Sequence, residues 1–83
     1  MKIDQYQKKA NMCGENVKKY RREQKVSQVD LAARIQTHGV ILEQKSISRI
    51  EAGTRVVADY ELFTLSKALN VTIYDLLGLP NPK

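Results

Sequence analysis

The stretch Gln44–Gly53 most constrains the fold, because its pattern predicts a short helix with two unlike faces. Ile47 and Ile50 fall on one face, which would pack inward. The opposite face carries polar side chains that can hydrogen-bond base edges and phosphates: Gln44, Lys45, Ser48 and Arg49. Gly53 is expected to end the helix, since glycine readily takes the left-handed conformation found just past a helix end. This stretch is therefore a candidate helix for reading DNA.

The length and charge of the chain fit that interpretation. At 83 residues the chain is one domain with a modest core. Its formal charge of +5 is uneven, because residues 1–34 hold nine Lys or Arg and four acids. This asymmetry suggests a polyanion partner, although such a charge run is more often only a solvated face. No apolar run approaches the length of a membrane span and no signal peptide is visible, so we expect a cytoplasmic protein.

Nothing in the sequence predicts catalysis. The single cysteine, Cys13, has no disulfide partner, and the single histidine, His38, cannot build a metal site with it. No paired carboxylates, nucleophile with a base, glycine-rich phosphate loop or metal-ligand cluster is present. We therefore expect neither an enzyme nor a bound cofactor or metal.

The N-terminal region predicts an arm, residues 1–11, followed by a helix over about residues 12–24. Apolar residues recur at heptad-like spacing across both parts, at Ile3, Tyr6, Ala10, Cys13, Val17 and Tyr20. Asn11 and Gly14 interrupt this stripe with poor helix formers, so the arm is either disordered or a helical piece against a neighbour. The helix also carries a basic cluster that serves either solubility or phosphate contact: Lys18, Lys19, Arg22 and Lys25.

A second helix begins after Ser27, which can cap it, and should run to about Thr37 or His38 before Gly39. Its start also has Asp30 in the capping-box position, and Leu31 and Ile35 face inward. The apolar run 40–42 is too short for a helix and should plug the core. Glu43 then precedes the helix at Gln44, where its charge suits the helix dipole.

Residues 54–57 read as a connector to a fourth helix that begins at Asp59 and ends near Asn70. Its predicted apolar stripe consists of Tyr60, Leu62, Phe63, Leu65, Ala68 and Leu69, with Glu61 and Lys67 projecting outward. A short fifth helix follows, capped by Thr72 and Asp75 and terminated by Gly78. Residues 79–83 form a tail that its two prolines keep out of any helix.

This order of helices resembles the Cro/C1-type (XRE) helix-turn-helix family of bacterial and phage regulators. The resemblance covers about residues 12–78 and rests on Arg21, Ser27-Gln28, Asp30-Leu31-Ala32, Ile47–Gly53, Leu65, Ala68–Val71 and Asp75–Gly78. It implies an all-α, five-helix lambda-repressor-like domain. One departure is the connection between the second and third helices, which is longer than in typical members, as in a subgroup with an extended connection.

The resemblance also implies roles for individual residues. Gln44, Lys45 and Arg49 match positions that contact bases. Phosphate contacts are implied for Ser27, Gln28, Ser48 and Arg55, and Gln28 would in addition brace Gln44. Arg21 and Glu51 match a structural ion pair between the first helix and the end of the third.

Two functions remain open at this point. The first is a regulator, expected to be a repressor, that binds a two-fold double-stranded DNA operator as a homodimer at the nucleoid of a prokaryote, or as a phage protein. The second is an antitoxin or adaptor that uses the same fold mainly to bind a toxin or another protein. The apolar residues of the arm, from Ile3 to Ala10, could serve such a partner.

Overall fold

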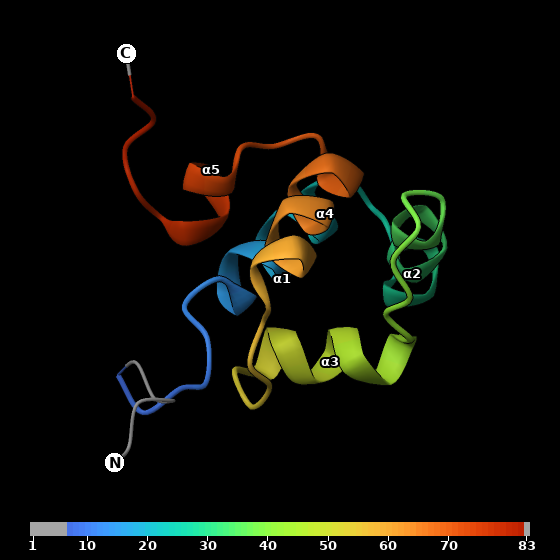
Figure 1. Ribbon diagram of the computed structural model, residues 1–83, viewed down its shortest axis with the longest axis horizontal. Coiled ribbons are helices and arrows are strands. Elements are labelled where there is room, and N and C mark those ends of the chain that lie inside the picture. The colour runs from blue at the N-terminus through green and yellow to red at the C-terminus, as the bar shows by residue number, and fades with distance from the viewer. Residues whose placement is uncertain (1–6, 83) are drawn as a thin grey trace.

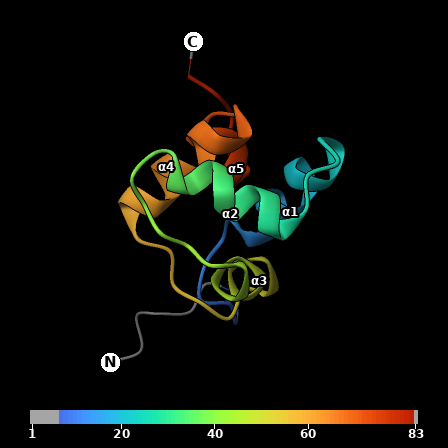
Figure 2. The same cartoon turned by 90° about the vertical axis from the view of Figure 1, so that its right-hand side faces the viewer.

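The computed structural model describes residues 7–82 and has the all-α fold that the sequence predicts. Its helices are α1 (Gly14–Glu23), α2 (Gln28–Gln36), α3 (Gln44–Ala52), α4 (Asp59–Leu69) and α5 (Ile73–Leu77). In Figure 1, α3 lies along the lower edge of the molecule, with α1, α2 and α4 above it. Figure 2 looks nearly along α3 and shows that no other helix lies below it. One side of α3 is therefore left uncovered.

No helix within residues 7–82 combines the length and the apolar character needed to cross a membrane.

The core draws on all five helices. Its largest fully buried side chains are Val17, Leu31, Ile35, Ile47, Ile50, Leu65, Leu69 and Leu76. Two of them, Ile47 and Ile50, come from α3 and are spaced three residues apart, so only one face of α3 is anchored. Cys13 is also buried, which raises the pKa of its thiol to about 11 and keeps it protonated near neutral pH.

The predicted caps at Ser27, Thr72 and Asp75 and the predicted ends at Gly53 and Gly78 are confirmed, whereas α2 ends at Gln36 and Asp30 does not complete a capping box with Ser27. The Ser27 hydroxyl accepts a hydrogen bond from the Asp30 amide at 3.0 Å and caps α2. Thr72 and Asp75 form a reciprocal capping box at the start of α5. Gly53 and Gly78 take left-handed conformations at the ends of α3 and α5, with φ of 79° and 70°.

The connection between α2 and α3 spans residues 37–43 and packs on the core through Leu42 and, partly buried, Val40. Leu42 is buried, whereas Ile41 is 76% exposed, so the prediction of an apolar plug is confirmed for Leu42 and wrong for Ile41. The segment from Val40 to Glu43 is not helical, and successive side chains of an extended chain point to opposite sides. Only alternate residues of such a run can face inward.

The predicted inner face of α4 is partly wrong. Tyr60 and Phe63 are exposed, and Glu61 is buried rather than projecting. Five buried positions follow the spacing i, i+3, i+4, i+7, i+8 of one helix face: Glu61, Thr64, Leu65, Ala68 and Leu69. Ser66 beside them is also buried. Burial of Glu61 is tolerated because its carboxylate has an arginine partner, and the Thr64 hydroxyl is satisfied by donating to the Tyr60 carbonyl at 2.7 Å.

Both ends of the described chain are tied to the helices. The Ala10 amide donates to the Gly53 carbonyl at 2.8 Å, which places this part of the arm beside the end of α3. In the tail, the Asn81 side chain hydrogen-bonds to Thr72 and Asp75 at the start of α5. Residues 1–6 of the arm, and with them Ile3 and Tyr6 of the apolar stripe, lie outside the described residues.

Candidate nucleic-acid interface

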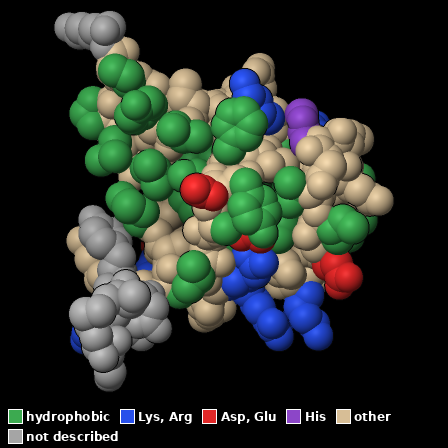
Figure 3. Space-filling view, viewed as in Figure 1, with side chains coloured by type: hydrophobic (Ala, Val, Ile, Leu, Met, Phe, Trp, Pro, Cys, Tyr) green, Lys and Arg blue, Asp and Glu red, His purple; other side chains and the backbone are tan. Residues whose placement is uncertain are grey.

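The uncovered face of α3 carries the polar residues that the sequence singled out. The side chains of Gln44, Lys45, Ser48 and Arg49 are all exposed. Figure 3 shows Lys and Arg side chains gathered at the lower edge of the molecule, where α3 lies. A positively charged helix face bordered by amide side chains is suited to the phosphates and base edges of DNA.

Gln44 at the start of α3 is held by Gln28 at the start of α2. The Gln44 Nε2 donates to the Gln28 Oε1 at 2.6 Å. The Gln28 Nε2 in turn donates to the Glu51 Oε1 at 3.1 Å. Gln44, although exposed, is therefore the outer end of a hydrogen-bonded series that begins inside the domain.

The inner end of that series is an ion pair between Arg21 of α1 and Glu51 of α3. The Arg21 Nε donates to the Glu51 Oε2 at 2.6 Å, and Nη2 donates to Oε1 at 2.9 Å. Both side chains are largely buried, at 11% and 3% exposure. The planar fork of arginine fixes the carboxylate in two directions, so the pair ties α1 to the last turn of α3.

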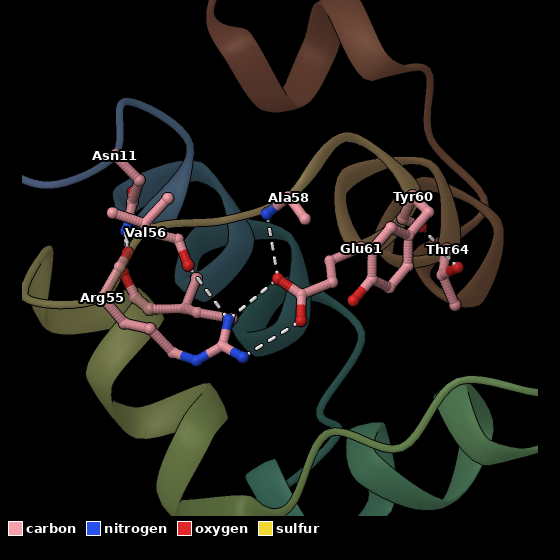
Figure 4. Close-up of polar contacts among 8 residues, drawn as sticks. Asn11, Arg55, Val56, Ala58, Tyr60, Glu61 and Thr64 are labelled. Carbon is pink, nitrogen blue, oxygen red and sulfur yellow. Dashed lines mark hydrogen bonds and ion pairs between the residues drawn. The ribbon is translucent and has the colours of Figure 1, made fainter. Parts of the chain in front are cut away.

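Arg55, for which the resemblance implies a phosphate contact, lies in a second ion pair. Figure 4 shows its guanidinium facing the carboxylate of Glu61, with bonds of 2.9 Å and 3.0 Å. The Glu61 Oε1 also accepts from the Ala58 amide at 2.9 Å, which caps α4. Sequence analysis missed this pair, because it took Glu61 as a solvated carboxylate that projects from the apolar stripe of α4.

The Arg55–Glu61 pair makes the free energy of unfolding depend on pH in the acidic range. Hydrogen bonds from Arg55, and then from the Ala58 amide, hold the pKa of Glu61 below its ordinary value of 4.5. As the pH falls, Glu61 is therefore protonated in the unfolded chain before it is protonated in the folded one. The stabilisation by the ion pair is complete above pH 4.5 and is lost as the pH falls through the lower pKa of the folded state. In urea unfolding measured at several pH values, Glu61→Gln should lose less stability below about pH 4.5 than the wild type.

Glu43 provides the control for that measurement, since it is exposed and has no ion-pair partner among residues 7–82. Glu43→Gln should follow the wild-type pH dependence. Equal acid dependence in the wild type and in Glu61→Gln would contradict the prediction.

Asn11 is a structural residue that sequence analysis also missed. Its Nδ2 donates to the carbonyls of Ile50 and Arg55, at 3.1 Å and 2.8 Å, and its Oδ1 accepts from the Gly14 amide at 2.7 Å. Asn11 thus joins the start of α1 to the end of α3 and to the connector beyond it (Figure 4). One local signal could have found part of this role, because an asparagine three residues before a helical residue is a typical cap.

The remaining site residues lie on either side of α3. Ser27 caps α2 directly before Gln28, and Arg21 donates from Nη1 to the nearby Val26 carbonyl at 2.9 Å. The structure thus brings Arg21, Gln28, Gln44 and Glu51 into one hydrogen-bonded group. It leaves Lys45, Ser48 and Arg49 with no side-chain hydrogen bond to another described residue.

Comparisons with known proteins identify the domain. A protein-family model described as "Helix-turn-helix" matches residues 17–76, which is more than half of the chain. A search of curated proteins and a search of solved structures each gave no match. The matched region runs from within α1 to Leu76 in α5 and contains the site residues described above, apart from Asn11.

Proposed function

Because the chain belongs to the Cro/C1-type helix-turn-helix family, which binds DNA, we propose that it is a sequence-specific transcriptional regulator whose α3 enters the major groove. On this proposal it binds a two-fold operator as a homodimer and represses the genes beside it, in the cytoplasm at the nucleoid. The observation that carries the proposal is the Gln28–Gln44 hydrogen bond of 2.6 Å, which fixes a base-reading side chain before DNA arrives.

The hydrogen bonds of Gln44 leave it able to recognise adenine. A glutamine amide has two N–H donors and one carbonyl oxygen. The bond to Gln28 uses one donor, so the other donor and the oxygen remain for adenine N7 and N6. Gln28 is in a similar position, because its bond to Glu51 leaves one N–H for a phosphate.

The other proposed DNA contacts come from side chains that still have free hydrogen-bond donors. Lys45 and Arg49 would reach base edges, and Arg49 can take a guanine through O6 and N7. Ser27 and Ser48 would donate to phosphates. Arg55 uses three N–H groups on Glu61 and the Val56 carbonyl, and the two that remain would serve a phosphate.

Random-site selection on duplex DNA tests the proposal. The selected sequences should form a palindrome whose half-sites lie about 34 Å apart, one helical turn, because two copies related by a two-fold axis would present two α3 helices. Recovery of no preferred sequence would contradict sequence-specific binding. Capture of a small partner protein that covers the site, with no selected DNA, would instead support an antitoxin or adaptor.

Replacement of Gln44 should relax sequence preference at one base pair. Gln44→Ala is expected to weaken the binding free energy by about 1–3 kcal/mol on the selected operator. The loss should be much smaller on an operator in which the base pair contacted by Gln44 is replaced. Binding titrations on the two operators measure the difference. Gln36→Ala is the control, because Gln36 is an exposed glutamine of α2 whose side chain makes no hydrogen bond to another described residue, and it should bind both operators as the wild type does. If Gln44→Ala, Lys45→Ala and Arg49→Ala all left specificity unchanged, the assignment of α3 would be wrong.

A further inference from the structure

The basic residues of α1 do not act as one cluster, because the helix turns them to different sides. Lys18 and Lys19 are adjacent in sequence and therefore about 100° apart around the helix. The Lys19 ammonium lies over the ring of Tyr20, 5.1 Å from its centre. Lys18 points to a different side of α1, beside the residues that lie four positions before it and three positions after it.

Lys18 lies on the face of α1 that contacts α3. Its neighbours on that face are Gly14, four residues before it, and Arg21, three residues after it. Gly14 approaches α3 so closely that a Cβ there would lie 2.0 Å from the Ile50 carbonyl oxygen. Arg21 is bonded to Glu51 in the next position of α3. Lys18 therefore lies along α1 between two residues that contact the last turn of α3.

The charge of Lys18 is not used within the described structure. Its side chain is only partly buried, and no carboxylate among residues 7–82 lies within ion-pair distance of it. Arg22, one turn further along α1, is also exposed. Glu15, three residues before Lys18, is paired with Lys9 at 2.6 Å, and Glu51 is paired with Arg21. This flank of α3 thus presents uncompensated positive charge.

The same flank carries the start of α2. Arg21 and Gln28 both bond to Glu51, so α1 and the first residue of α2 meet α3 on one side. Figure 2 shows α1 and the start of α2 above α3, with the lower side of α3 free. A DNA strand that borders the groove entered by α3 would run past Gln28 and then past α1.

We propose that Lys18 binds a DNA phosphate on this flank, next to the phosphate that Gln28 contacts. The inference rests on the proposed function and adds to it a binding residue outside the helix-turn-helix unit of α2 and α3. Arg22 supplies positive charge to the same strand. An ammonium that neutralises a phosphate releases a condensed counterion, so its contribution is visible in the salt dependence of binding.

A structural role for Lys18 would give different results in binding and unfolding measurements. A lysine beside the end of α3 could instead stabilise the C-terminal carbonyls of that helix. In that case its loss would lower the free energy of unfolding and leave the salt dependence of DNA binding unchanged. The two roles therefore separate in a pair of measurements.

The test compares Lys18→Gln with Lys19→Gln, which remove the same charge from adjacent positions. Binding to the selected operator is titrated at salt concentrations from about 0.05 to 0.2 M, the range over which counterion release dominates. Lys18→Gln should reduce the slope of log K against log salt by about 0.9 and weaken binding about fivefold to tenfold near 0.1 M salt. Lys19→Gln should keep the wild-type slope. Urea unfolding of both variants shows whether either is destabilised.

Three results would overturn the inference. Equal changes of slope in both variants would show that only net charge matters. If Lys18→Gln kept the wild-type slope of log K against log salt but had a lower free energy of unfolding, Lys18 would have a purely structural role. The proposed function would still stand in that case, provided that Arg49→Ala lost sequence specificity. Absence of any preferred sequence for the wild type would remove the proposed function and the phosphate site together.

Discussion

Gly14→Ala should destabilise the domain by about 3 kcal/mol, because the added methyl group has no space. A Cβ at Gly14 would lie 2.0 Å from the carbonyl oxygen of Ile50, which is a backbone atom that no rotamer change can move. Helix propensity alone predicts the opposite result, a gain of about 1 kcal/mol from glycine to alanine. The sign of the change in urea unfolding therefore tests the α1–α3 contact directly.

Glu23→Ala is the control for this substitution, since it places alanine at an exposed position of the same helix. It should change the unfolding free energy by less than about 0.5 kcal/mol. If Gly14→Ala were as stable as Glu23→Ala, the close approach of the two helices would be contradicted. Because small domains have only about 5–15 kcal/mol of stability in total, a loss of 3 kcal/mol is large enough to measure without ambiguity.

Glu51→Ala should cost about 3–5 kcal/mol, since it leaves the buried guanidinium of Arg21 without its partner. The substitution also removes the acceptor of Gln28. Replacing both partners with apolar residues, as Arg21→Met with Glu51→Leu, should cost less than either Arg21→Met or Glu51→Leu alone. A double-mutant cycle followed by urea unfolding measures the coupling.

The ion pair between Lys9 and Glu15 is a matched control, because its N–O distance is also 2.6 Å. Its side chains are 43% and 78% exposed, so water screens it, and Glu15→Ala should lower the free energy of unfolding far less than Glu51→Ala does. Similar losses for Glu15→Ala and Glu51→Ala would show that burial of the Arg21–Glu51 pair does not govern its strength.

The sequence predicted what depends on nearby residues. Ser27, Thr72 and Asp75 bond to amides three positions away, and Gly53 and Gly78 act through their own conformations. Such features can be read from a few consecutive residues. The face of α3 was predicted for the same reason, since Ile47 and Ile50 define it within one helix.

What the sequence did not predict depends on residues far apart in the chain. Glu61 was placed outward because a carboxylate in a helix is usually solvated, and its burial depends on Arg55 in the preceding connector. Asn11 bonds to a carbonyl 44 positions away. In the sequence, Gly14 only interrupts a helical stripe, whereas in the structure it lets α1 lie against the carbonyl oxygen of Ile50. No local pattern records these pairings.

The connection of residues 37–43 gives the domain a place for added sequence. Residues 37–39 are exposed, Gly39 has open space around it, and Val40 and Leu42 fasten the following segment to the core. The orientation of α3 is set from elsewhere, by Gln28, Arg21 and Asn11. A fluorescent or affinity label inserted after Gly39 would therefore report on the bound protein from beside the reading helix without turning it.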